Sequence, residues 1–133
     1  YYEKKDMDNY LKWAKNAGER GVGDAQFNLG VYYDKLSNKR EAENWYLKAA
    51  EQNNFRAQYN LGVHYYKVGN MKEAENWFLK AAEQNDKSAQ YNLGVLYYES
   101  KQLEKAQNWY EKAAVQGHVG AQEELSKLMG GEK

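Results

Sequence analysis

Apolar and small residues recur along the chain with the spacing of amphipathic helices. Between residues 24 and 35, Ala25, Leu29, Gly30 and Tyr33 fall on one side of a helix that turns by about 100° per residue. A second stripe lies between residues 39 and 53, and charged side chains surround it. Its members are Ala42, Trp45, Tyr46, Ala49 and Ala50. The pattern predicts two helices, A and B, whose small residues allow close approach while the rings fill the space beside the contact.

The whole two-helix pattern repeats every 32 residues without a slip, as the stretches AQFNLGVYYD, AQYNLGVHYY and AQYNLGVLYY show. Counted from the alanine, the repeats read 25–56, 57–88 and 89–120. When each repeat is instead counted as one A helix followed by one B helix, the three repeats occupy residues 23–54, 55–86 and 87–118. They belong to a single repeat domain, 1–133. Residues 1–22 match a B helix without its A partner, and residues 119–133 match an A helix with a tail. The C-terminal helix, where Glu123 and Ser126 replace the aromatic residue and the glycine, is typical of the cap of a repeat array.

Short connectors join A to B within each repeat. Gly69 suits the left-handed position that follows a helix, whereas Ser37 and Lys101 replace it in the other repeats and predict less ideal turns. Short links favour antiparallel hairpins. One pair cannot bury its own stripe, so neighbouring pairs must stack. The expected fold class is therefore all-α, an α-solenoid of antiparallel helix pairs.

The repeat resembles the Sel-one-like family, a relative of the tetratricopeptide repeats. The segments KAAEQN and KAAVQGHVGAQ are similar to its junction between repeats, and LGVHYYKVGNMKEA is similar to a tetratricopeptide turn. Sel-one-like units usually have an A-to-B loop about four residues longer. The resemblance implies a right-handed solenoid whose A helices line a concave surface, and a non-enzymatic adaptor that binds a protein or peptide there. That functional class follows from the fold alone.

Asparagine recurs at one position of the outward side of each A helix, although it is a poor helix former. A row of side-chain amides can hold the backbone of an extended peptide. Alternatively, each amide bonds a loop or a neighbouring helix. The same side carries aromatic and basic residues, which either bind a partner or, for Phe27, Tyr59 and Tyr91, pack between helices. The predicted partner-binding set is Asn28, Asn60, Asn92, Arg56, Tyr59, Tyr91, Tyr66, Tyr98 and Lys67.

Other recurring residues predict structural roles. Gln26, Gln58 and Gln90 lie beside the core stripe and are expected to bond a neighbouring backbone. The tryptophans of the three B helices are expected in the core, namely Trp45, Trp77 and Trp109.

Composition excludes several function classes. Nineteen basic residues balance nineteen acidic ones, so there is no basic face for nucleic acid. Cysteine is absent, and His64 and His118 have no second ligand at metal spacing, so no metal or cofactor is expected. No catalytic motif, transmembrane run or signal peptide is recognised.

The chain starts with Tyr1, so a targeting segment could have been removed, and the compartment is left open. Self-association through the open side of residues 1–22 is the alternative to an adaptor.

Overall fold

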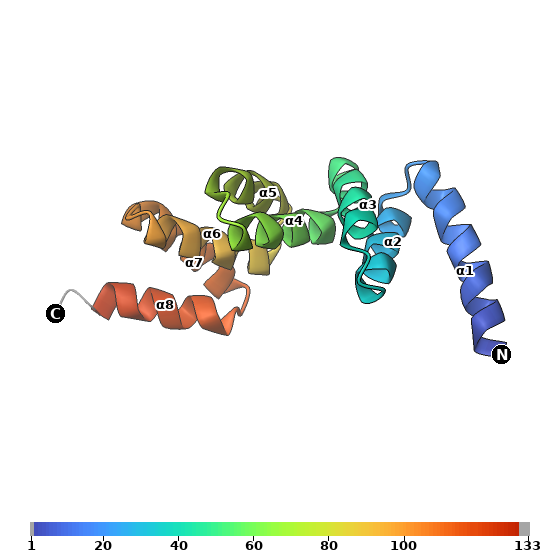
Figure 1. The fold of residues 1–133 in the computed structure, drawn as a ribbon. Coiled ribbons are helices and arrows are strands. Elements are labelled where there is room, and N and C mark those ends of the chain that lie inside the picture. The colour runs from blue at the N-terminus through green and yellow to red at the C-terminus, as the bar shows by residue number, and fades with distance from the viewer. Residues whose placement is uncertain (1, 131–133) are drawn as a thin grey trace. The chain divides into compact units, whose positions relative to one another are not determined.

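The computed structural model describes residues 2–130, with side chains from residue 7 onward, and the regular elements in this range are helices joined by short turns. Figure 1 shows the helices in chain order: α1 (Tyr2–Glu19), α2 (Gly23–Lys35), α3 (Lys39–Glu51), α4 (Phe55–Lys67), α5 (Met71–Glu83), α6 (Lys87–Glu99), α7 (Leu103–Val115) and α8 (Val119–Gly130). The predicted all-α class is confirmed. The chain divides into two compact units, Tyr1–Leu61 and Gly62–Lys133, with the division inside α4.

In the first unit, α2 packs against both α1 and α3. Ala14, Leu29 and Trp45 form a buried cluster, and Leu11 and Tyr33 pack against it. Glycine is required where α2 meets α3, because a Cβ on Gly30 would lie 2.5 Å from a ring carbon of Tyr46. The predicted combination of a small residue and an aromatic ring is therefore what holds this hairpin together.

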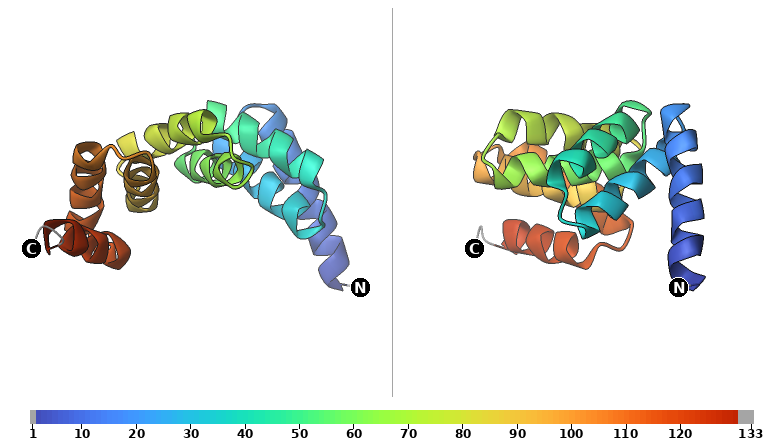
Figure 2. Two further views of the ribbon diagram at one scale, coloured as in Figure 1. Left: turned by 60° about the vertical axis from the view of Figure 1, so that its left-hand side comes forward. Right: turned by 45° about the vertical axis from the view of Figure 1, so that its right-hand side comes forward.

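In the second unit, α6 packs against α5 and α7, and α8 packs against α7 (Figure 2). The glycine contact recurs here: a Cβ on Gly62 would lie 2.5 Å from a ring carbon of Phe78, and one on Gly94 would lie 2.5 Å from a ring carbon of Tyr110. Phe78, Tyr110 and Leu93 are almost fully buried. The same packing rule thus builds both units.

The turns after the A helices share one backbone conformation. Gly69 has φ +86°, and Ser37 and Lys101 have φ 62° and 64° at the equivalent positions. The left-handed region costs a residue with a Cβ more than it costs glycine. Ser37 and Lys101 therefore hold these turns at the cost of local strain, as expected from the sequence. Asn38 and Asn70 then cap the next helices by accepting bonds from Glu41 and Glu73 backbone N–H groups, each at 3.3 Å.

The tryptophans do not all lie in the core. Trp45 and Trp77 are 7% and 8% exposed, but Trp109 is only half-buried, which corrects the expectation of three core tryptophans. Trp109 lines a surface hollow with neighbouring residues of α7, so one side of its ring stays open. A lysine one turn on lies over each of the three rings, with Nζ 4.4–4.7 Å from the centroid in every case. At the equivalent position of α1, Trp13 is 59% exposed.

Candidate partner-binding surface

Asn60 has a structural partner. It is half-buried on α4, and its side-chain amide faces the hydroxyl of Tyr46 on α3. Burial raises the pKa of Tyr46, the charge of Asp34 raises it further, and the bond from Asn60 opposes the shift. The alternative in which the asparagine bonds a neighbouring helix therefore describes Asn60.

Asn28 and Asn92 differ from Asn60. Asn28 is exposed on α2, Asn92 is half-buried on α6, and neither side chain has a hydrogen-bond partner among the described residues. The repeat register explains the difference, because the positions equivalent to Tyr46 carry Ala14 and Phe78, which have no hydroxyl. Two of the three predicted amides are thus available for an outside ligand.

The aromatic residue before each asparagine contributes to packing within the units. Phe27 lies with its ring centroid 5.8 Å from that of Tyr46, and Tyr91 lies 5.8 Å from Tyr110 in a similar tilted arrangement. Tyr91 also stacks on His118, with centroids 4.5 Å apart and planes at 17°. Tyr59 is half-buried at the equivalent position on α4. These contacts favour the packing alternative for Phe27 and Tyr91.

Sequence reasoning missed the role of His118. Its Nδ1 accepts a 3.1 Å hydrogen bond from the backbone N–H of Ala121, so the side chain caps α8 as well as stacking on Tyr91. Asn54 does the same two junctions earlier in the register, accepting from the Ala57 backbone N–H at 3.1 Å. A polar residue three positions before the repeating alanine was the available signal.

The remaining predicted residues lie near helix ends. Tyr66 donates to both carboxylate oxygens of Glu99, at 2.8 and 3.0 Å, and this bond raises the pKa of Tyr66. Tyr98 is 48% exposed, and Lys67 is exposed at the end of α4. Arg56 is exposed in the first unit, with its guanidinium 5.4 Å from the ring centroid of Phe55. Glu99 was not in the predicted set.

The buried glutamines are structural, as predicted. Gln26, Gln58 and Gln90 donate to the carbonyls of Gly18, Ala50 and Ala82, at 2.8, 3.1 and 3.3 Å. Each bond spans eight residues and closes the junction between a B helix and the next A helix. Gln122 repeats the bond to Ala114 at 3.1 Å. Gln26, Gln58 and Gln90 are buried, so a partner protein cannot reach their side chains.

We refer to the outward-facing residues of the A helices as the A-helix face of each unit. In the first unit it consists of Asn28, Arg56, Tyr59 and Asn60, and in the second unit of Tyr66, Lys67, Tyr91, Asn92 and Tyr98. Within residues 2–130, no helix has both the length and the apolar character that crossing a bilayer requires.

Two family models match the sequence. The Sel1 repeat matches residues 23–54, and the tetratricopeptide repeat matches residues 53–114. A search of curated proteins finds no match.

Several solved structures resemble the chain. A Sel1 repeat protein from Oxalobacter formigenes is 33% identical, with a TM-score of 0.78, and the alignment covers 88% of this chain and 97% of that one. Also similar is c5321, a protective antigen of uropathogenic Escherichia coli with an SLR fold, at 36% identity and a TM-score of 0.77; the match covers 90% of this chain and 29% of that one. MamA shows the same fold at 21% identity, covering 98% of this chain and 81% of that one, with a TM-score of 0.68.

Proposed function

The chain belongs to the Sel1 repeat family, whose members are generally non-enzymatic protein-interaction scaffolds, and from this we propose that it binds an extended segment of a partner protein on its A-helix face. No catalytic role is proposed for any residue.

The observation that carries the proposal is the free amide of Asn92. The half-buried amide of Asn92 loses some of its hydrogen bonds to water, and no protein group among the described residues replaces them. A peptide backbone offers a donor and an acceptor that match the amide oxygen and nitrogen. Asn28 offers the same groups in the first unit, whereas Asn60 already bonds Tyr46. We therefore assign ligand binding to Asn28 and Asn92 and a positioning role to Asn60.

Exposed tyrosine supports the same surface. Tyr98 presents about half of its side chain on α6, and tyrosine combines a large apolar ring with a polar tip. Preformed helices hold these groups in place, so the ordering cost on the protein side is small. In this proposal the asparagine amides bind the backbone of the partner segment, and the tyrosine ring packs against its side chains. Binding of this kind is reversible, as an adaptor requires.

The test is affinity capture from lysate of the source cell, read by mass spectrometry. The baits are the parent chain, the Asn28→Ala/Asn92→Ala/Tyr98→Ala variant and a control, Asn108→Ala. Asn108 is an exposed asparagine on a B helix, so its loss changes composition but not the A-helix face. We expect a protein that is captured by the parent and the control and is lost with the triple variant. Equal capture by all three, with the fold intact by circular dichroism, contradicts the proposal.

Self-association is the second candidate function, and the exposure of Trp13 favours it. Its register equivalents Trp45 and Trp77 are buried against neighbouring helices, whereas Trp13 is 59% exposed on α1 with Tyr10 beside it, their ring centroids 6.2 Å apart. This candidate predicts a mass that rises with concentration in sedimentation and returns to that of the monomer in Trp13→Ala. A constant monomer mass contradicts it.

A further inference from the structure

A cleft of about 490 Å³ lies in the second unit, between the start of α5 and the end of α6. We name it the α5–α6 cleft. Its lining residues are Met71, Lys72, Glu75, Leu96, Tyr97, Glu99, Ser100 and Gln102. Leu96 and Tyr97 are buried and form an apolar wall, while Met71 is exposed at the rim. The cleft involves Glu99 but none of the nine residues predicted to bind a partner.

Two carboxylates in this lining are held in place by tyrosine hydroxyls. Glu75 accepts from Tyr97 at 2.5 Å, and Glu99 accepts from Tyr66 at 2.8 Å. A carboxylate has about four acceptor sites, so each retains unused ones. Among the described residues, neither Glu75 nor Glu99 forms an ion pair within 4.0 Å. The cleft therefore contains two positioned negative charges without a cation bound to them.

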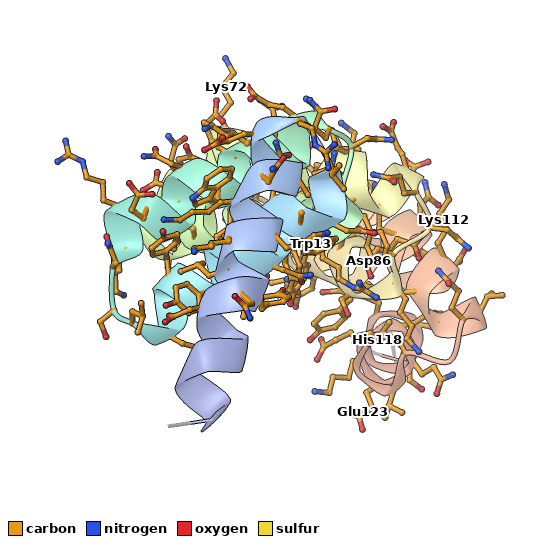
Figure 3. The ribbon with its side chains drawn as sticks, turned by 90° about the vertical axis from the view of Figure 1, so that its right-hand side faces the viewer. Trp13, Lys72, Asp86, Lys112, His118 and Glu123 are labelled. Carbon is orange, nitrogen blue, oxygen red and sulfur yellow. The ribbon has the colours of Figure 1, made fainter. Side chains whose placement is uncertain are left out.

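Two lysines close to the cleft, Lys72 and Lys105, do not form ion pairs with these carboxylates. Lys72 belongs to the lining, but its side chain extends away from the ribbon (Figure 3). Lys105 lies on α7 with its Nζ 5.4 Å from the centroid of the Tyr97 ring. That contact shows that the face of Tyr97 accepts a cation, while Lys105 bonds neither glutamate.

The repeat register shows that packing does not require this combination of residues. Glu99 stands where the two earlier repeats carry Lys35 and Lys67, so the charge is reversed. Leu96 stands where they carry Tyr32 and His64. The framework residues, by contrast, are identical or nearly so in every repeat. Glu75 and Tyr97 have counterparts in earlier repeats, so Glu99 and Leu96 are what distinguish this cleft.

We propose that the α5–α6 cleft binds an arginine side chain of a partner protein, in a segment where the arginine is flanked by apolar residues. The methylene groups of the arginine pack on Leu96 and Tyr97, as long cationic side chains do on apolar surfaces. The guanidinium bonds Glu75 and Glu99, because its fork of donors matches carboxylate oxygens. This site goes beyond the A-helix face and does not depend on it.

The test uses two synthetic peptides, acetyl-Ala-Leu-Arg-Leu-Ala-amide and the same peptide with citrulline in place of arginine. Citrulline keeps the size and shape of the side chain but is neutral. Each is titrated into the ¹⁵N-labelled full chain while amide shifts are recorded by NMR. We expect the arginine peptide to shift amides in 71–75 and 96–102, and the citrulline peptide to bind at least about fivefold more weakly, as expected for loss of a charged hydrogen bond.

Variants connect the binding to the two carboxylates. Glu99→Gln and Glu75→Gln should each weaken the arginine peptide at least about fivefold. Glu83→Gln is the matched control, since Glu83 is exposed on α5 and lies outside the lining. Glutamine still offers an acceptor to Tyr97 and Tyr66, so the fold should persist; if Glu75→Gln unfolds, Glu99→Gln carries the test.

The result that overturns the proposal is equal affinity for the two peptides, or no shifts at the cleft at millimolar peptide. Binding that survives both glutamate variants overturns it as well. The Asn28→Ala/Asn92→Ala variant should leave the arginine peptide unaffected. A failure of the A-helix face is thereby separated from a failure of the cleft.

Discussion

The two units use one framework but put the same aromatic positions to different use. In the first unit, the Tyr46 hydroxyl faces Asn60, and Lys15 lies over the Tyr33 ring with its Nζ 5.9 Å from the centroid, where Tyr33 raises the pKa of that lysine. In the second unit, Phe78 replaces Tyr46 in the register, and the counterpart of Tyr33, Tyr97, donates to Glu75. Residues that repeat unchanged hold the helices together, and residues that vary decide which polar groups remain free. The variable positions therefore decide where a repeated polar residue, such as the asparagine of each A helix, is left available to a ligand.

The largest expected effect comes from breaking the shared framework in one unit. Gly94→Ala places a Cβ about 2.5 Å from the ring of Tyr110, so the ring or the helix must move. Overpacking of this kind lowers the free energy of unfolding by up to about 3 kcal/mol. The measurement is urea unfolding followed by circular dichroism. Ser126→Ala is the control, because Ser126 occupies the same register position on α8, where it is exposed. An unchanged midpoint for Gly94→Ala would show that the contact relaxes freely.

Next in size is the hydrogen bond between Tyr97 and Glu75 in the second unit. Tyr97→Phe removes a hydrogen bond to a charged group and should cost about 1.5 kcal/mol at neutral pH. Burial, and then the bond to Glu75, raise the pKa of Tyr97, so the folded state favours the neutral hydroxyl.

The same shift fixes the direction of a pH dependence. Stabilisation by neutral Tyr97 is complete below the unfolded pKa of about 10 and is lost as the pH rises above that value. Burial also raises the pKa of Tyr110, so Tyr97→Phe should reduce the alkaline loss of stability without removing it. Urea midpoints between pH 8 and pH 11 measure both effects. A parallel decline in parent and variant would contradict the assignment to Tyr97.

A smaller effect tests the difference between the asparagines directly. Tyr46→Phe removes the partner of Asn60 and should cost about 1 kcal/mol, while making the first unit resemble the second. The reciprocal change, Phe78→Tyr, restores a hydroxyl at the register position beside Asn92. We expect it to weaken any ligand held by Asn92, measured as affinity for the captured partner. If neither exchange alters stability or affinity, the register argument is wrong.

The smallest effect concerns the turns that follow the A helices. These turns carry different residues in the three repeats, and none of those residues belongs to the A-helix face. Ser37→Gly and Lys101→Gly should each raise the free energy of unfolding by about 0.5 kcal/mol, because both residues have positive φ. Gly69→Ala should act in the opposite direction, and nothing lies within 4 Å of the added Cβ to confuse the result. Thermal melts of the three variants provide the comparison. A loss of stability in both glycine variants would show that the side chains of Ser37 and Lys101 matter more than the backbone.

Periodicity predicts much of the fold because packing repeats with it. The second helix was expected over 39–53 and spans Lys39–Glu51, and the role of the three glutamines follows from their place beside the core stripe. The candidate site was harder to predict. Asn28, Asn60 and Asn92 look alike in sequence, and only the identity of the residue facing each one separates them. The α5–α6 cleft was missed because its walls come from different repeats, and because two of its residues, Leu96 and Glu99, differ from their counterparts in the other repeats.

The glutamine bond at each junction has a consequence for how the chain folds. A bond that spans eight residues closes a small loop, so its entropic cost is low and it forms without distant parts of the chain. Contacts of this kind give a low contact order, which is typical of fast folding, and repeat arrays can start to fold at any of their units. Each junction is thus a separate starting point. Hydrogen exchange should accordingly show protection that is lost junction by junction rather than in one step.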